Sequence, residues 1–346
     1  MKIIYFIIIS GCLILSSCSS EPKSTQQNQV EQKEQVAPIL SSWNEGETKT
    51  SIIDFVNRTT DKSNRDFIEV KDRIAVFDND GTLWAEQPSY FQLIFALDKI
   101  KALAPEHPEW STEQPFKAVI EDDTETMKSF HTKELLTLVM ASHTGQTHEE
   151  FQEEVIAWNN STKHPRFEKP FTDLVYQPML ELLDYLQQND FKTYIVSGGG
   201  VYFMRALVTE VYNIPEEQII GTTIVTNFVS KGNTYVITRA PEIEFINDKE
   251  GKSVNINKII GKKPVFCAGN SDGDLAMMQY TSTNTLPYFN LYVHHTDSER
   301  EWAYDSLSHI GRLKKGFTEA QVNGWTIANM QEDWKVIFPF ESDSEK

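Results

Sequence analysis

Residues 73–84 constrain the fold more than any other stretch, and they read R-I-A-V-F-D-N-D-G-T-L-W. The apolar run at residues 74–77 is typical of a β-strand that is buried on both faces. It ends abruptly in Asp78, Asn79 and Asp80. Two carboxylates at the end of a buried strand cost on the order of several kcal/mol unless they are paired or protonated. Because hard divalent cations take oxygen ligands, the pattern predicts a metal site at this strand end.

A second apolar strand, expected at residues 191–196, runs into Ser197 and three glycines. Residues 201–211 then have the pattern of a helix. Glycines let backbone N–H groups approach an anion, and the helix offers the positive end of its dipole. The order of strand, hydroxyl, glycines and helix therefore predicts a phosphate-binding turn. A plain strand-to-helix turn is the simpler alternative.

Two further segments, in the C-terminal part of the chain, contain candidate functional residues. Lys252 stands just before an amphipathic helix and is the first candidate here for a functional lysine. Lys249 and Lys258 in the same segment are the alternatives. Residues 264–268 then form another apolar run, and it ends in the acidic loop G-N-S-D-G-D-L-A-M at residues 269–277. Paired histidines follow a short strand at residues 291–293. Neighbours on a strand face opposite ways, so they are not expected to share a metal.

The string D-N-D-G-T-L resembles the first motif of the haloacid dehalogenase (HAD) superfamily, D-x-D-x-T-[LV]. The Ser197 turn, Lys252 and the acidic loop resemble its three later motifs and occur in the same order. The S-G-G form is similar to phosphoserine phosphatase-like members. This resemblance implies an α/β fold, with a Rossmann-like core built on a central parallel sheet. One residue departs from the pattern, because Asn270 stands where relatives commonly carry a metal-binding aspartate.

The segment after the first motif has a helical pattern, with Thr147 as the expected N-cap of its third helix. An all-helical insert at this point resembles the C1-type cap that covers the site in these enzymes. The expected organisation is a core of residues 51–85 and 170–346, with a helical cap at 86–169.

The resemblance assigns a role to each motif residue. Asp78 would be the nucleophile and Asp80 the general acid and base. Ser197 and Lys252 would complete the catalytic group, and Gly198 and Gly199 would bind phosphate. Magnesium would be the cofactor, held by Asp78, Asp80, Asn270 and Asp274. Asp272 stays open as another ligand, since an amide oxygen binds Mg²⁺ without contributing charge.

The implied function is hydrolysis of a small phosphomonoester through an aspartyl-phosphate. Asp80 favours a phosphatase over a dehalogenase, because a departing halide needs no proton. The residues are also compatible with a phosphomutase or with a non-catalytic binding lipoprotein. Glu86 and Trp84 suggest that the substrate carries a cationic group, as phosphoserine or phosphorylcholine does, since a carboxylate and an aromatic face suit a cation. The simpler interpretation is that Trp84 only packs the hinge of the cap.

The N-terminus predicts export. Residues 3–15 are apolar but too short for an ordinary membrane span, and Leu15-Ser16-Ser17-Cys18 resembles a bacterial lipobox. Residues 1–18 would be a signal peptide, with Cys18 lipidated and anchored in a membrane of the cell envelope, at the outer membrane or the periplasmic face. An ordinary secretory signal cut elsewhere is the alternative. The polar residues 19–50 are expected to be a disordered tether. A formal charge of −18 over 346 residues argues against nucleic-acid binding.

Overall fold

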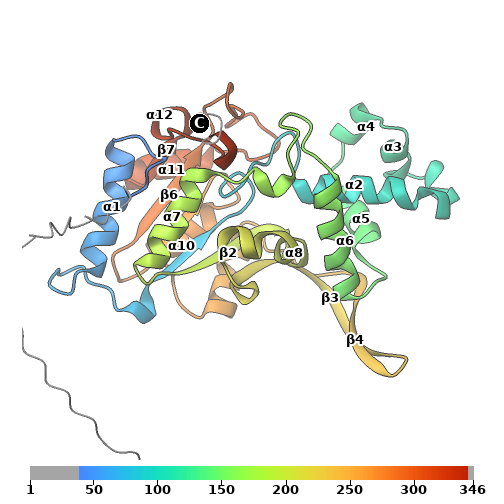
Figure 1. Cartoon of the computed structure of the whole chain (residues 1–346), viewed down its shortest axis with the longest axis horizontal. Helices are drawn as coiled ribbons and strands as arrows, with labels where there is room; N and C mark the ends of the chain where they lie inside the picture. The colour runs from blue at the N-terminus through green and yellow to red at the C-terminus, as the bar shows by residue number, and fades with distance from the viewer. Residues whose placement is uncertain (1–38, 342–346) are drawn as a thin grey trace, which may run out of the picture. The chain divides into compact units, whose positions relative to one another are not determined.

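The fold is known from a computed structural model, which describes residues 39–341. In this part of the chain seven strands form one sheet, in the order β4-β3-β2-β1-β5-β6-β7. Neighbouring strands are parallel except for the antiparallel pair β3 and β4. The predicted α/β fold with a central parallel sheet is therefore confirmed (Figure 1). The strands are β1 (Ile74–Phe77), β2 (Lys192–Gly200), β3 (Ile219–Lys231), β4 (Thr234–Phe245), β5 (Phe266–Gly269), β6 (Phe289–His294) and β7 (Thr326–Asn329).

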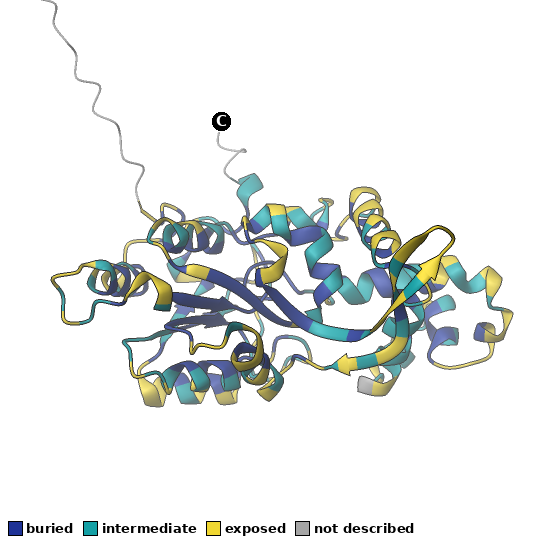
Figure 2. Cartoon of the chain, turned by 90° about the horizontal axis from the view of Figure 1, so that it is seen from below, coloured by how far each residue is buried: buried dark blue, intermediate teal, exposed yellow. Residues whose placement is uncertain are grey.

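Helices cover both faces of the sheet. Successive side chains of β1 alternate between two hydrophobic clusters, with Ala75 and Phe77 in one and Ile74 and Val76 in the other. The first cluster also contains residues of α1 (Glu47–Thr60), α7 (Gln177–Gln188) and α8 (Val201–Tyr212). The second contains residues of α10 (Leu275–Ser282), α11 (Lys315–Asn323) and the π-turn Ile256–Ile260 that extends α9 (Glu250–Asn255). Figure 2 shows the resulting buried strands between more exposed helices.

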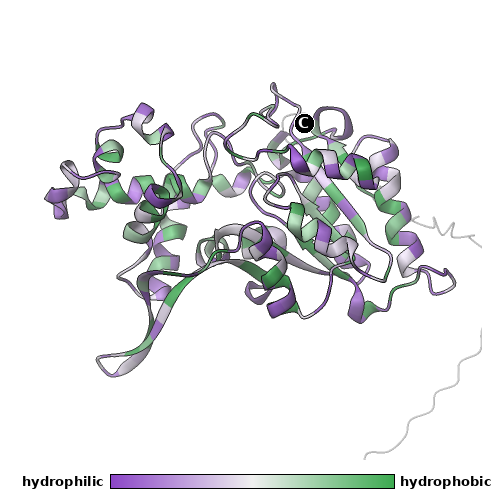
Figure 3. Ribbon diagram, turned by 180° about the vertical axis from the view of Figure 1, so that it is seen from behind, coloured by the Kyte–Doolittle hydropathy of each residue, from purple (hydrophilic) through white to green (hydrophobic). Residues whose placement is uncertain are grey.

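The segment between β1 and β2 is helical, as the sequence predicts. Its helices are α2 (Phe91–Leu103), α3 (Phe116–Ile120), α4 (Thr124–Lys128), α5 (Thr132–His143) and α6 (His148–Ser161). They carry a small apolar cluster of their own, in which Trp110 stacks on Phe116 with ring centroids 4.4 Å apart. Thr147 caps α6 as expected, since its hydroxyl accepts from the Glu150 N–H. Figure 3 shows apolar residues both in the sheet and along these helices.

Short turns complete the described secondary structure. The 3₁₀ turns are Val70–Asp72, Ala104–Glu106, Pro108–Ser111, Phe171–Asp173 and Glu216–Gln218, and the last α-helix is α12 (Met330–Asp333).

The β3–β4 hairpin reaches beyond the sheet and contacts the helical insert. Gly232 makes its turn with φ 65°, a left-handed conformation that glycine adopts without strain. Farther along β4, the Arg239 N–H donates to the Gln146 carbonyl at 3.2 Å, and the Gly145 N–H donates to the Arg239 carbonyl at 3.1 Å. These hydrogen bonds join the hairpin to the segment between α5 and α6 of the insert.

The predicted tether ends earlier than residue 50, which corrects that boundary. Trp43 is buried against Trp334, and its indole N–H donates to the Pro178 carbonyl at 2.9 Å. The Ser42 N–H also donates to Glu181 Oε2, and the Asn44 N–H to the Asp333 carbonyl, both at 2.8 Å, so this segment packs on the core. Cys18 and the predicted signal peptide lie outside the described residues. Among the described residues, no helix is long and apolar enough to cross a membrane.

Candidate active site

The motif residues converge because their strands are neighbours in the sheet. Strand β1 lies between β2 and β5, so Asp78 after β1 lies between Ser197 on β2 and Asn270 after β5. The Asp78 N–H continues the ladder by donating to the Ala268 carbonyl at 2.9 Å. All three positions lie at the carboxyl ends of parallel strands, where open α/β sheets bind ligands.

Lys252 is the cation of this site. Its Nζ lies 2.5 Å from Asp78 Oδ1 and 2.6 Å from Asp274 Oδ1, and all three side chains are buried. The rivals Lys249 and Lys258 are exposed. Burial alone would lower the pKa of Lys252, but the carboxylates of Asp274 and Asp78 outweigh it, so this pKa is raised. Lys252 therefore remains charged at neutral pH.

Asp80 is held between two partners on opposite sides. Its Oδ1 accepts from the Trp84 indole N–H at 2.8 Å, and its Oδ2 lies 3.4 Å from the Ser197 hydroxyl. Gly81 follows with φ 73°, which turns the chain back so that its N–H reaches the Trp84 carbonyl. Burial raises the pKa of Asp80 above its usual value, with the Trp84 hydrogen bond acting in the opposite direction. Trp84 is itself buried and serves to orient Asp80.

The predicted phosphate-binding turn is preorganised by hydrogen bonds. Ser197 Oγ accepts from the Gly199 N–H at 3.0 Å, and the Ser197 carbonyl accepts from Asn247 Nδ2 at 2.8 Å. The Thr222 hydroxyl donates to the Gly198 carbonyl at 2.7 Å. Helix α8 begins directly after the turn, at Val201. The turn is thus fixed on its carbonyl side, with the N-terminus of a twelve-residue helix beside it.

The two aspartates of the acidic loop after β5 make different contacts. Asp274 Oδ2 accepts from the N–H groups of Asn270 and Ser271, both at 3.0 Å, while its Oδ1 binds Lys252. Asp272 accepts from the Lys314 and Gly316 N–H groups at 2.9 Å and so ties this loop to α11. Asp274 thus joins the acidic loop to Lys252 through its two oxygens, and its role as a metal ligand stays a prediction.

Glu86 lies against Asn270. Its Oε1 accepts from Asn270 Nδ2 at 2.7 Å and from the Tyr304 hydroxyl at 2.8 Å. The carboxylate is enclosed so closely that a Cβ on Gly81 would lie 2.3 Å from Oε1, and one on Gly311 would lie 1.9 Å from it. Burial raises the pKa of Glu86 well above its usual range. The sequence singles out Glu86 for substrate binding, but gives no sign that it would contact the acidic loop.

The two histidines separate, as expected for neighbours on a strand. His295 is buried, and its Nε2 donates to the Gly81 carbonyl at 2.7 Å while its Nδ1 lies 3.2 Å from Glu301 Oε2. His294 instead packs against Phe317, with ring centroids 5.2 Å apart. His295 therefore supports the turn that follows Asp80.

The oxygen atoms of this region suit a hard cation. Asp78, Asp80, Glu86 and Asp274 together place four buried or half-buried carboxyl groups beside one lysine, an imbalance that a divalent cation would relieve. Among residues 39–341, however, no three His, Cys, Asp or Glu side chains form a complete metal site. Main-chain and amide oxygens would have to contribute. Asn270 Oδ1 accepts one hydrogen bond, from the Thr82 hydroxyl at 3.2 Å, and retains a second lone pair.

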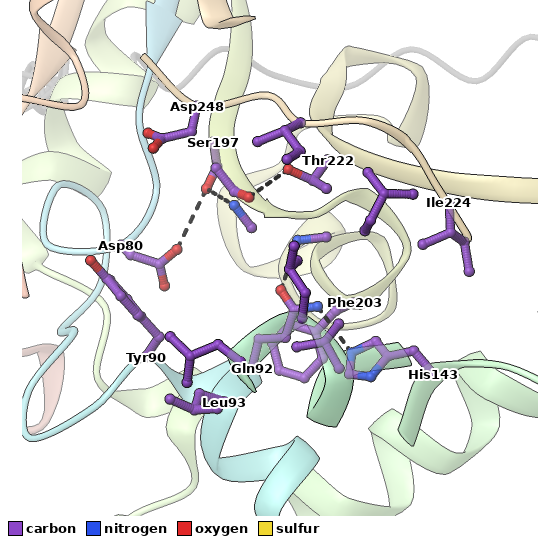
Figure 4. A pocket seen from close by; sticks show the side chains of 18 of the residues that line it. Asp80, Tyr90, Gln92, Leu93, His143, Ser197, Phe203, Thr222, Ile224 and Asp248 are labelled. Atoms are coloured by element: carbon purple, nitrogen blue, oxygen red, sulfur yellow. Dashed lines mark hydrogen bonds between the residues drawn. The ribbon is translucent and has the colours of Figure 1, made fainter. Parts of the chain in front are cut away.

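A cavity of about 340 Å³ connects these residues with the helical insert (Figure 4). Asp78, Asp80, Ser197 and Lys252 line one end of it. At the other end, α2, α5, α8 and β4 contribute mainly apolar side chains, together with Gln92, His143 and Arg239. Sequence reasoning missed these three polar residues, because each occurs singly in a helix or strand without a motif around it.

Gln92 links the phosphate-binding turn to the insert. The Gly200 N–H donates to Gln92 Oε1 at 2.7 Å, which leaves the Gln92 amide N–H to donate to His143 Nε2 at 2.9 Å. His143 then carries its proton on Nδ1, which lies 2.7 Å from the Ser142 hydroxyl. Burial, followed by the nearby Arg239 charge, lowers the pKa of His143 to about 3. The ring is therefore neutral, in agreement with its hydrogen bonds.

One known protein family matches this chain. The profile of the haloacid dehalogenase-like hydrolases matches residues 75–279, which is more than half of the chain. The chain belongs to this family. The matched range begins in β1 and extends through the acidic loop after β5, so it contains all four motifs of this HAD hydrolase. No curated protein matches the chain.

Three solved structures are similar to this chain at low sequence identity, and the first of them, with a TM-score above 0.5, shares the fold. A conserved protein of unknown function from Anaerococcus prevotii DSM 20548 is 17% identical with a TM-score of 0.52, over 74% of this chain and 87% of that one. A protein of unknown function from Bordetella pertussis Tohama I gives 13% and 0.45, over 75% and 99%. A phosphoserine phosphohydrolase-like protein from Francisella tularensis subsp. tularensis SCHU S4 gives 16% and 0.38, over 75% and 97%. At these identities the likeness concerns the fold alone.

Proposed function

We propose that this HAD hydrolase is a Mg²⁺-dependent phosphomonoester hydrolase that works through an aspartyl-phosphate on Asp78. The observation that carries the proposal is Lys252, buried and bound to both Asp78 and Asp274 at the carboxyl edge of the sheet. A lysine between two buried carboxylates, next to a phosphate-binding turn, is suited to neutralise a phosphoryl group during its transfer.

In the first half-reaction, an Asp78 carboxylate oxygen attacks phosphorus and forms a P–O bond, while the bond from phosphorus to the alcohol oxygen breaks. Asp80 gives its proton to the departing alkoxide, and its raised pKa favours the protonated form that this step needs. The Ser197 hydroxyl and the Gly198 N–H bind phosphoryl oxygens, because the Gly199 and Gly200 N–H groups already donate to Ser197 Oγ and Gln92 Oε1. Lys252 offsets the negative charge that collects around them.

In the second half-reaction, Asp80 is ionised and takes a proton from a water molecule. The resulting hydroxide attacks phosphorus, the bond to Asp78 breaks, and inorganic phosphate leaves. The two steps return Asp78 and Asp80 to their starting states. The hydrogen bonds of Asp80 to Trp84 and Ser197 keep its carboxyl group in position for both proton transfers.

A bound magnesium ion would screen the repulsion between the Asp78 carboxylate and the phosphate dianion. The Asp78 carboxylate, the Asp80 main-chain carbonyl and the Asn270 side-chain oxygen would hold it. Asn270 contributes no charge, but Glu86 lies 2.7 Å from its amide nitrogen. Burial raises the pKa of Glu86, and a bound cation would act against that shift and favour the ionised form. We infer that Glu86, ionised in this way, supplies the negative charge that relatives carry on the loop residue itself. Asp274 instead positions Lys252.

A dehalogenase, a non-catalytic binding module and a cationic substrate group have less support. Asp80 is oriented by two hydrogen bonds, a provision that a dehalogenase would not need. A binding module without catalysis would have no use for a buried lysine between two carboxylates, which is costly to maintain. A cationic substrate group at Glu86 and Trp84 is also less favoured, because Trp84 is bound to Asp80 and Glu86 to Asn270.

Export and attachment to the cell envelope through a lipid on Cys18 are further proposals, supported by the sequence of residues 1–18. They would give the enzyme access to phosphomonoesters outside the cytoplasm. Mass spectrometry of the protein extracted from membranes tests them, since a lipidated N-terminal Cys18 is expected and an unmodified N-terminus elsewhere would contradict the anchor.

Hydrolysis of an aryl phosphate tests the reaction directly. Activity is expected with Mg²⁺, and it should fall to background with EDTA and return when Mg²⁺ is added back. Full activity in EDTA would contradict the magnesium requirement. Absence of hydrolysis for a panel of aryl and alkyl phosphates would contradict the function.

A further inference from the structure

Arg239 is a buried cation in the cavity wall without an anionic partner among the described residues. It lies on β4, only 4% of its surface is exposed, and it lines the cavity. Its Nη1 is buried and has no hydrogen-bond partner, and among residues 39–341 no Asp or Glu pairs with it. A buried guanidinium with an unsatisfied N–H is costly, and arginines used only for packing are normally satisfied.

The position of the guanidinium is fixed by its other contacts. Its Nε donates to the His143 carbonyl at 2.6 Å. Its central carbon lies 3.9 Å from the centroid of the Phe151 ring and 4.7 Å from that of Tyr202. Aromatic rings hold an arginine by its planar faces and leave its edge for hydrogen bonds. The contacts therefore orient Arg239 without neutralising it.

Arg239 keeps its positive charge, and its neighbour His143 carries none. His143 is neutral, and burial lowers the pKa of Arg239 only to about 10, so Arg239 is charged at neutral pH. The side chains that α5 and β3 contribute to the cavity are largely apolar, including Leu135, Val139 and Ile224. An anion placed here would lose water but gain a charge-assisted hydrogen bond.

We propose that Arg239 binds an anionic group on the alcohol part of the substrate, which makes the substrate a small phosphomonoester with a second acidic group. This inference rests on the proposed function for the identity of the first group, the phosphate at Asp78. Gln92 and His143 connect the phosphate-binding turn to Arg239, since Gln92 bonds the Gly200 N–H and His143 Nε2, and the His143 carbonyl accepts from Arg239 Nε. The second acidic group is a carboxylate or a second phosphate, and both present oxygens to the guanidinium edge.

Binding of phosphonates tests the inference without requiring turnover. A series of ω-phosphonocarboxylates of increasing chain length is compared with alkylphosphonates of matched length, alkane diphosphonates and aminoalkylphosphonates, by calorimetry with Mg²⁺ present. The wild type is expected to prefer the carboxylate or the second phosphonate by about tenfold or more at one chain length. That length reports the distance between the two ends, and the preferred group identifies the second acid.

Two substitutions separate this role from a structural one. Arg239→Gln is expected to reduce the preference about ten- to a hundredfold, while Arg239→Lys retains part of it, since only the charge remains. The preference is a ratio within each variant, so general damage to the fold cancels. Arg65→Gln, at a side chain that is 93% exposed, is the matched control and should leave the preference unchanged.

The outcomes distinguish the inference from the proposed function. If the wild type shows no preference for a second anion, or if Arg239→Gln retains the preference, the inference is overturned even where aryl phosphates are hydrolysed. If the preference depends on Arg239 but no phosphomonoester is hydrolysed, the anion-binding role of Arg239 stands and the proposed function fails. A preference for aminoalkylphosphonates would overturn it in favour of a cationic substrate group.

Discussion

The two ends of the cavity are built in different ways. At the catalytic end, Asp78, Asp80, Ser197 and Lys252 come from short motifs that the sheet topology brings together, and Lys252 is paired with two carboxylates. At the outer end, single residues from the helical insert and the β3–β4 hairpin face a mainly apolar space, and Arg239 keeps an unsatisfied N–H. Strand order thus brings the motif residues together, while the insert and the hairpin line the rest of the cavity.

The largest expected effect is at the catalytic end. Asp78→Asn should lower kcat by about a thousandfold or more, since loss of a covalent nucleophile removes the reaction path itself. Steady-state hydrolysis of an aryl phosphate measures it, and thermal melting checks that the variant is folded. A variant that is folded and retains kcat within about tenfold of the wild type would show that Asp78 is not the nucleophile.

Lys252→Met should lower kcat by about a hundred- to a thousandfold, because it removes the cation nearest the transferring phosphoryl group. It also leaves Asp78 and Asp274 facing each other, so the free energy of unfolding should fall by about 3–5 kcal/mol. Kinetics and urea denaturation measure the two effects. Lys258→Met, at an exposed lysine farther along the chain, is the control and should change neither.

Glu86→Gln tests whether Glu86, at the catalytic end, serves the metal site or binds the substrate. If Glu86 supplies charge to the metal site, the variant should bind Mg²⁺ about ten- to a hundredfold more weakly, without a change in phosphonate preference. Calorimetry with Mg²⁺ alone measures the affinity, and Glu149→Gln at an exposed position is the control. A loss of selectivity for aminoalkylphosphonates with unchanged Mg²⁺ affinity would instead restore Glu86 to the substrate site.

The smallest expected effect concerns pH at the outer end. The pKa of His143 falls to about 3 in the folded chain from 6.5, so the unfolded chain binds its proton first. Stability is thus complete above about pH 6.5 and is lost as the pH falls, by about 1.4 kcal/mol per pH unit from this group. Denaturation at about pH 7 and about pH 5 should show a smaller loss in His143→Gln. The exposed His309→Gln is the control, and equal losses in all three proteins would contradict a buried neutral His143.

The sequence predicts the part of the fold that depends on local pattern. Apolar runs before Asp78, Ser197 and Gly269 correspond to β1, β2 and β5, and their order determines which side chains meet. Strand β7 is missed because its residues, Thr-Ile-Ala-Asn, have too few apolar side chains to form a run. Trp43 gives no local signal either, since its burial depends on Trp334 far away in the chain.

The candidate site likewise contains residues that the sequence identifies and residues that it does not. Lys252 is distinguishable from Lys249 and Lys258 only once α9 is folded, because burial and distance to Asp78 separate them. Arg239 is invisible in the sequence, since its role depends on contacts with the insert, made by ordinary residues far apart in the chain. The motif residues can be identified in the sequence, whereas the cavity beside them is a product of tertiary packing.

Trapping the phosphoryl group on Asp78 tests the central claim most directly. The enzyme is mixed with an aryl phosphate and Mg²⁺, quenched in acid within one turnover, digested and measured by mass spectrometry. One phosphoryl group is expected on the peptide that contains Asp78, and none in the Asp78→Asn variant or in EDTA. Rapid turnover with an unmodified Asp78 at every quench time, or a phosphoryl group on another residue, would contradict the account.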